Sequence, residues 1–116
     1  MREEVIKIRD IAGAGFVGSR YTGEILRDRI DKIIEKGEIA VLDFEGITGI
    51  TQSFGDEILG IYIRAFGTDF VKKHLKFINL HPNVRQILKW VFVYSRRYNS
   101  ATRERNHLPH PACNLP

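Results

Sequence analysis

The order of apolar and polar positions along the chain predicts three β-strands. A continuous apolar run from Ile39 to Leu42, ended by Asp43, is typical of a central parallel strand covered on both faces. Residues Glu4 to Ile11 alternate in part between apolar and charged positions, which indicates a half-exposed strand near a sheet edge. Residues Leu75 to Leu80, followed shortly by Pro82, predict a third strand.

Apolar residues at helical spacing predict three helices. The first runs from about Ser19 to Lys36, with Gly37 placed to end it. The second begins at Ser53, and Asp56 three residues later resembles a capping box. Its apolar face consists of Phe54, Ile58, Leu59, Tyr62, Ile63 and Phe66. The third runs from Pro82 to about Tyr98. The resulting β-α-β-α-β-α order predicts a small single-domain α/β fold with a mainly parallel central sheet and packed helices.

Length and charge fit one domain with a polar tail. At 116 residues the chain has the size of a single domain, which we expect to span residues 1–98. Residues 99–116 are polar and basic without periodicity, and we expect them to be disordered or ordered by a partner. The net charge is +4, and four arginines against one glutamate from Ser95 onward supply +3 of it. No basic face with interleaved aromatic residues is evident in the body, so nucleic-acid binding is not favoured, and binding through the Arg-rich tail after Ser95 stays a third alternative.

Two features of the sequence bear on localisation. The longest apolar run, Trp90 to Tyr94, is far too short to span a membrane, and no secretory signal opens the chain. The single cysteine, Cys113, excludes an internal disulfide and fits a reducing compartment. We therefore expect a cytoplasmic protein without a membrane partner.

Three glycines match a nucleotide-binding pattern. Gly13, Gly15 and Gly18 spell G-x-G-x-x-G, the fingerprint in which glycines let a pyrophosphate approach a helix N-terminus. However, the preceding strand carries charges such as Lys7, and Asp43 lies 30 residues beyond Gly13 instead of the usual distance of about 20. A glycine loop leading into a helix is favoured, and nucleotide binding by these glycines stays the alternative.

Ser53 has two interpretations. As an N-cap it satisfies a backbone N–H at a helix start, a contribution of about 1 kcal/mol. As a phosphoacceptor it would hold a phosphate at the positive end of the helix dipole, where Asp56 and Glu57 would repel it. Residue chemistry alone favours the cap. Asp56 and Glu57 are adjacent on the helix and point about 100° apart, so we predict no acid/base pair and no catalytic residue.

The tail contains residue types that bind soft metals. His107, His110 and Cys113 form H-x-x-H-x-x-C, but prolines interrupt the segment and a clear fourth ligand is lacking. We therefore predict no metal site.

Three short motifs resemble those of STAS-like domains of unknown function, which are relatives of the sulfate-transporter and anti-sigma-factor-antagonist fold. They are Gly-Ser-Arg at 18–20, Leu-Asp-Phe-Glu-Gly-Ile at 42–47 and Ser-Phe-Gly-Asp-Glu-Ile at 53–58, and Asn79 fits the strand that follows. The resemblance covers about residues 4–95 and implies a small α/β domain with a central sheet and helices.

The resemblance also implies a function. In anti-sigma-factor antagonists, the loop and helix start after the central strand bind a GHKL-type ATPase kinase, which phosphorylates a serine there. Ser53 matches that serine, so the resemblance implies a non-enzymatic regulatory module without a cofactor. The chain has Thr51-Gln52-Ser53-Phe54 where the antagonists have Asp-Ser-Ser/Thr-Gly, so docking without phosphorylation stays open. The implied partner-binding residues are Gly18, Ser19, Arg20, Asp43, Ser53, Phe54, Asp56 and Glu57. We further expect Arg20 to pair with Asp43.

Overall fold

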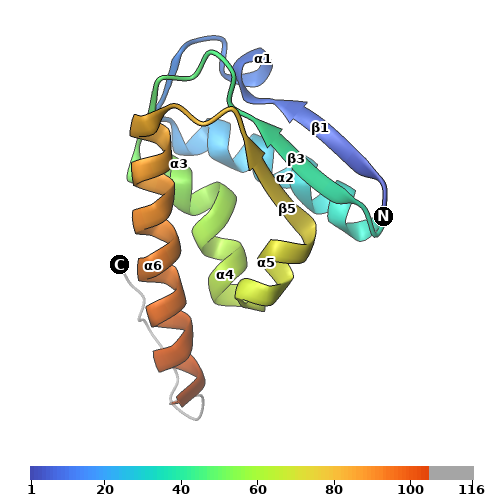
Figure 1. The fold of residues 1–116 in the computed structure, drawn as a ribbon, viewed down its shortest axis with the longest axis vertical. Coiled ribbons are helices and arrows are strands. Elements are labelled where there is room, and N and C mark those ends of the chain that lie inside the picture. Colours follow the sequence, from blue (N-terminus) through green and yellow to red (C-terminus); the bar gives the residue numbers. More distant parts are fainter. Residues whose placement is uncertain (105–116) are drawn as a thin grey trace.

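A three-stranded parallel sheet is the framework of the domain (Figure 1). The computed structural model describes residues 1–104, and in it β3 (Ile39–Asp43) lies between β1 (Glu3–Lys7) and β5 (Leu75–Ile78). Both pairings are parallel, with Val41 opposite Val5 on one side and opposite Lys76 on the other. The prediction of a small α/β fold with a parallel sheet centred on residues 39–42 is confirmed.

The helices gather on one side of this sheet. In the view of Figure 1, α2 lies behind the strands, and α3, α4 and α6 pack together beyond β5. The remaining elements, in chain order, are α1 (Ile8–Ala12), β2 (Phe16–Val17), α2 (Arg20–Glu35), β4 (Gly49–Ile50), α3 (Gln52–Gly55), the π-helical segment η1 (Asp56–Gly60), α4 (Ile61–Phe66), α5 (Thr68–His74) and α6 (Pro82–Glu104).

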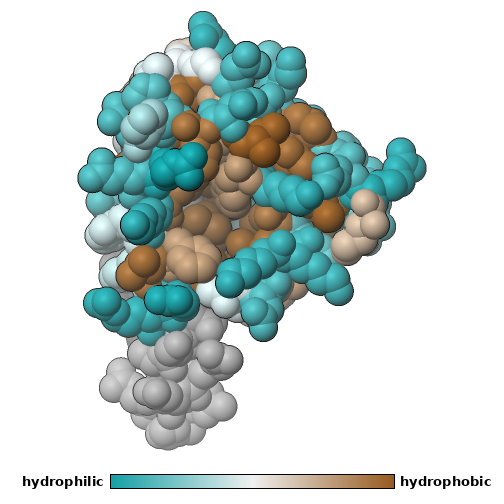
Figure 2. All heavy atoms as spheres, viewed as in Figure 1, coloured by the Kyte–Doolittle hydropathy of each residue, from teal (hydrophilic) through white to brown (hydrophobic). Residues whose placement is uncertain are grey.

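The two faces of the sheet differ in burial. Side chains alternate along a strand, and the helix-facing positions Ile6, Leu42 and Leu75 are buried. On the opposite face Val41 of the central strand is 4% exposed, whereas Val5 and Ile78 of the flanking strands are 52% and 39% exposed. Figure 2 accordingly shows apolar patches over the strands among hydrophilic side chains. The core therefore lies between the sheet and the helices.

The first strand is shorter than the sequence predicts. The expected strand from Glu4 to Ile11 ends at Lys7, and the chain turns into α1. Gly13 closes this short helix with φ 74°, a conformation that glycine adopts without strain, and its N–H donates to the carbonyl of Arg9 at 2.8 Å. Ile8 remains fully buried. The apolar pattern therefore predicts correctly that Ile8 is buried, but it does not predict that the chain turns into α1 after Lys7.

The predicted cap of the second helix is wrong. Thr51, not Ser53, is the N-cap, because its Oγ1 accepts a hydrogen bond from the N–H of Phe54 at 3.1 Å. The helix therefore begins at Gln52, and Ser53 lies exposed within its first turn. Thr51 is fixed in this role by its own hydroxyl, which also donates to the carbonyl of Gly18 at 3.3 Å.

The other helices follow the pattern with two differences. Ser19 caps α2, its Oγ accepting from the N–H of Thr22 at 3.3 Å, and Gly37 follows the helix with φ 77°. The last helix was expected to end near Tyr98 and instead continues to Glu104. The third strand ends at Ile78 instead of Leu80. Of the tail at 99–116, residues 105–116 lie outside the part of the chain that the structure describes.

Two phenylalanines of the second helix test this packing. Phe54 is fully buried, whereas Phe66 is 59% exposed and stacks on Phe70 with ring centroids 4.5 Å apart. We expect Phe54→Ala to lower the free energy of unfolding by about 3–5 kcal/mol, and the matched Phe66→Ala to lower it by about 0.5–1.5 kcal/mol. Urea unfolding followed by circular dichroism measures both, and equal losses would contradict the assigned helical face.

Candidate functional site

The starts of two helices lie side by side at one end of the molecule. The short strands β2 and β4 pair in parallel, Phe16 with Gly49 and Val17 with Ile50. The N–H of Thr51 donates to the carbonyl of Val17 at 3.1 Å, which continues this pairing to the two caps. Segments far apart in the sequence, residues 18–20 and 51–57, are thereby brought together. We call these two segments the paired helix starts.

A buried carboxylate holds the paired helix starts together. Glu57 is only 3% exposed, and its two carboxylate oxygens bind separate arginines, Arg20 and Arg27 of α2. Gly23 of α2 makes room for this contact, because a Cβ there would lie 2.8 Å from the Cβ of Glu57. An unpaired charge at this depth costs several kcal/mol, so the two arginines are what permit Glu57 to be buried and ionised.

Asp56 belongs to a different cluster. Arg64 donates from its two terminal nitrogens to the two oxygens of Asp56 at 2.6 and 2.9 Å, and also donates to the hydroxyl of the buried Ser95 at 3.1 Å. Asp56 and Glu57 thus point to different neighbours, as their adjacent positions predict. Each carboxylate near Ser53 is matched by arginine.

Asp43 ends the central strand in a third environment. It is 8% exposed and accepts hydrogen bonds at 2.9 Å from the side-chain amide of Asn79 and from the N–H of Glu45. The hydrogen bond from Asn79 is the main cause that holds the pKa of Asp43 below its ordinary value, followed by the N–H of Glu45; burial opposes them. Asp43 therefore stays ionised.

The predicted pair between Arg20 and Asp43 is wrong. Arg20 binds Glu57, while Asp43 binds Asn79 and borders a depression of about 340 Å³ that is lined by Lys7, Arg9, Asp10, Asp43, Glu45 and Gly46. The sequence placed both residues at one edge of the sheet but could not show that the first turn of α2 leans towards the second helix. Asp43 and the paired helix starts are separate features.

The three glycines of the nucleotide-binding pattern occupy three different environments. Gly13 closes α1, Gly15 accepts from the N–H of Thr48 at 2.8 Å, and Gly18 lies against Thr51. The fingerprint requires a strand, a tight turn and a helix in direct succession, whereas α1 and β2 intervene here. The glycines are explained by loop packing, and nucleotide binding remains an untested alternative.

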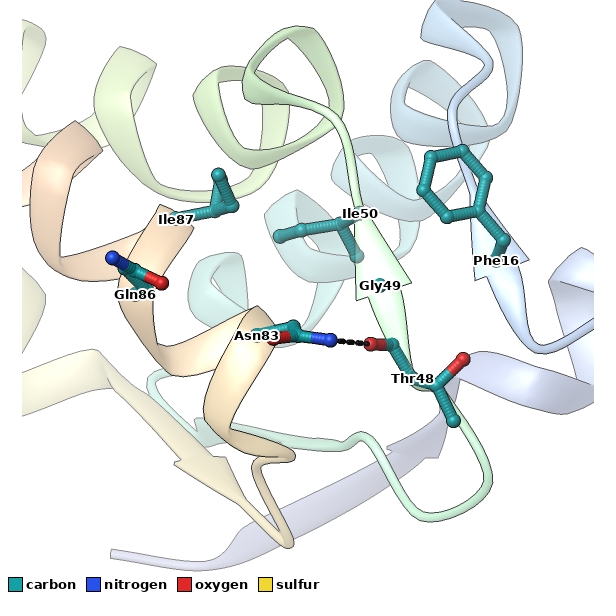
Figure 3. A pocket seen from close by; sticks show the side chains of 7 residues that line it. All are labelled: Phe16, Thr48, Gly49, Ile50, Asn83, Gln86 and Ile87. Atoms are coloured by element: carbon teal, nitrogen blue, oxygen red, sulfur yellow. Dashed lines mark hydrogen bonds between the residues drawn. The ribbon is translucent and has the colours of Figure 1, made fainter.

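A groove beside the paired helix starts was missed by sequence reasoning. It has a volume of about 440 Å³ and is lined by Phe16, Thr48, Gly49, Ile50, Asn83, Gln86 and Ile87. Figure 3 shows Phe16 and Ile87 on either side of Ile50, and Asn83 donating to the carbonyl of Thr48 at 3.4 Å. Phe16 is 60% exposed. The strands β2 and β4 beside this groove are too short to show a pattern of apolar and polar positions in the sequence. The aromatic residue Phe16 is the signal by which the sequence could have indicated the groove.

Several predicted site residues differ in accessibility. Gly18, Ser19, Arg20 and Ser53 are exposed, whereas Phe54 and Glu57 are buried and support the surface from beneath. Among the described residues, no three side chains of the metal-binding types are grouped to hold a metal ion. His107, His110 and Cys113 lie outside the described part of the chain. Within that part, no helix is long and apolar enough to cross a bilayer.

Comparison with known protein families identifies the fold. The model of a family described as a STAS-like domain of unknown function matches residues 22–85, more than half of the 116-residue chain. The chain belongs to this family. No curated protein and no solved structure matches it significantly. The matched span of this STAS-like domain contains Asp43, Ser53 and both carboxylates of the second helix, while the first helix start at 18–20 precedes it.

The hydrogen bond between Asn79 and Asp43 makes a pH-dependent prediction. Asn79 has φ 57°, so Asn79→Gly removes the amide donor without straining the backbone. Because the pKa of Asp43 is lower in the folded state, this bond stabilises the fold above the ordinary value of 3.8 and the gain is lost as pH falls below it. We expect the variant to lose about 1.5–3 kcal/mol at neutral pH and progressively less in acid.

The matched control is Asn83→Gly. Its amide donates to the neutral carbonyl of Thr48, so the loss on substitution should not vary with pH in the acid range. Urea unfolding at a series of pH values measures both variants. A deficit of Asn79→Gly that stays constant down to strong acid would contradict the assigned role of Asp43.

Proposed function

We propose that this STAS-like domain is a non-enzymatic regulatory module that docks a GHKL-type ATPase through the paired helix starts, and that Ser53 is the residue its partner phosphorylates. The observation that carries this proposal is the exposed Ser53 hydroxyl beside two carboxylates that are both held by arginines. The partner uses ATP, so the proposal is for a cytoplasmic protein.

The local charges support a phosphate at Ser53. A phosphoserine carries about −1.5 to −2 charges at neutral pH, which unpaired carboxylates in the same turn would repel. Glu57 is bound by Arg20 and Arg27, and Asp56 by Arg64, so three cations face two anions around this turn. The repulsion expected from the sequence is therefore compensated.

Arg20 is suited to respond to phosphorylation. Its side chain is 56% exposed, whereas that of Arg27 is 32% exposed. Residues four positions apart share a helix face, so Ser53 lies one turn above Glu57, the residue that Arg20 binds. A phosphate at Ser53 would compete for Arg20, while Arg27 would keep Glu57 paired. Phosphorylation would then alter the charge and shape of the docking surface without exposing a buried anion.

The docking surface extends beyond Ser53. Gly18 and Ser19 are exposed next to Ser53. The groove lined by Phe16 opens beside Gly18, because a Cβ added to this glycine would lie 3.1 Å from the Phe16 ring. Exposed aromatic residues beside a groove are typical anchors of protein interfaces. Phe54 supports this surface from the core and is not expected to contact the partner.

The direct test is phosphorylation by the partner. The domain is used to co-purify a GHKL-type ATPase from the native host, and mass spectrometry identifies that ATPase. The ATPase is then purified and incubated with the domain and ATP. We expect the intact mass to rise by one phosphoryl group in the wild type and in Thr68→Ala, which removes a hydroxyl at the start of α5 outside the docking surface, but not in Ser53→Ala. We also expect Ser53→Glu to weaken binding of the ATPase about tenfold, or 1.4 kcal/mol.

Three results separate the alternatives. Equal binding of wild type and Ser53→Glu without phosphorylation would keep the docking module and remove the switch. Phosphorylation that persists in Ser53→Ala would assign another acceptor. If no ATPase co-purifies and nucleotides raise the melting temperature instead, the glycine-loop alternative replaces this proposal, because a ligand at 100 times its dissociation constant stabilises by about 2.7 kcal/mol.

A further inference from the structure

The outward side of α6 carries four cations. Arg85, Lys89, Arg96 and Arg97 are exposed, and no acidic residue occurs between Pro82 and Arg97. None of the four forms an ion pair with another described residue. Their spacing puts Arg85, Lys89 and Arg96 along one flank of the helix. The basic character that the sequence assigned to a tail therefore belongs in part to α6.

Two aromatic rings lie on the other flank of the same surface. Trp90 and Tyr94 are 48% and 49% exposed and stack in parallel, with ring centroids 5.2 Å apart and an interplanar angle of 4°. Helical spacing puts Arg97 beside them, three positions after Tyr94. We call the six residues Arg85, Lys89, Trp90, Tyr94, Arg96 and Arg97 the α6 face. Figure 1 shows α6 along the outer side of the helical layer, and all six residues of the α6 face are exposed.

Two other occupants fit the α6 face poorly. A second copy in symmetric contact would bring four cations against four cations, which is repulsive. A membrane-surface helix buries a broad apolar face in the lipid, but Val84, Leu88 and Val91 of α6 are already buried in the core. Between Pro82 and Arg97, the exposed large apolar side chains of α6 are Trp90, Tyr94 and the 37% exposed Val93.

We propose that the α6 face of this domain binds single-stranded nucleic acid. Cations in a row match the regularly spaced phosphates of a strand, and exposed aromatic rings stack on unpaired bases regardless of their sequence. Duplex bases are not available for such stacking, which favours a single strand. This site is separate from the paired helix starts and does not depend on the function proposed for them.

Two features of the binding follow from these residues. Each phosphate neutralised on a single strand contributes about −0.7 to the slope of log affinity against log salt concentration, so four cations predict a slope of about −3. Stacking on an aromatic residue accounts for about tenfold in affinity per base when tested by alanine substitution. Binding should therefore be both salt-dependent and aromatic-dependent, a combination that charge attraction alone does not produce.

The experiment measures fluorescence anisotropy of a labelled oligothymidine of about 20 nucleotides with the full chain at several salt concentrations. We expect Tyr94→Ala to weaken binding about tenfold, and Tyr21→Ala, a tyrosine that is 71% exposed on α2, to change it less than about twofold. Circular dichroism verifies that both variants remain folded.

A second comparison uses two double variants that have the same net charge as each other. Arg85→Glu with Lys89→Glu should reduce the magnitude of the salt slope by at least about 1.4. Lys72→Glu with Lys73→Glu changes the same number of exposed cations on α5 and should leave the slope unchanged. Equal effects of the two double variants would overturn the assignment to α6, because net charge alone would then account for binding.

Three further results would overturn the proposal. One is absence of oligothymidine binding at low salt. Another is equally tight binding of polyglutamate with no effect of Tyr94→Ala, which would show attraction of any polyanion. The third is Tyr94-dependent binding to vesicles containing phosphatidylserine that is tighter than binding to the oligonucleotide, which would assign the α6 face to a lipid surface.

Discussion

The buried carboxylate of Glu57 is the constraint on which the arrangement of this domain depends. It lies between the second helix and α2 and is bound by Arg20 and Arg27. Without both arginines the buried carboxylate would be an uncompensated charge, which costs about 3–5 kcal/mol. The pairing also offsets an unfavourable position of Arg20, since a cation in the first turn of a helix opposes the helix dipole. The register of the two helices is thereby fixed.

This ion cluster links the fold to the proposed function. It holds the two helix starts side by side and compensates the negative charge of the turn that carries Ser53. In the proposed function, a phosphate added there would compete with Glu57 for Arg20, while Arg27 keeps Glu57 paired. The hydrogen bonds of Thr51 to Phe54 and Gly18 keep the serine within the first turn. The family match covers this turn and the central strand.

The sequence predicts the features that repeat along the chain. The apolar run of residues 39–42 identified the central strand, and apolar spacing identified α2, the second helix and α6. The sequence did not predict features that depend on a single short contact. Thr51 is the N-cap instead of Ser53 because its hydroxyl accepts from the N–H of Phe54. Gly13 closes the helical turn α1, where the alternating pattern predicted that the strand continues. The partner of Arg20 was missed because the pairing with Glu57 joins residues 37 positions apart. The aromatic stack on α6 likewise emerges only when the helix is built.

The most direct measurement is an NMR titration of the labelled domain with the purified GHKL-type ATPase. Docking through the paired helix starts predicts that backbone signals of residues 18–20 and 51–57 shift or broaden first, while those of the exposed sheet face at Val5 and Ile78 do not change. Changes confined to that sheet face, or no change at saturating ATPase, would contradict docking at the site that Glu57 organises.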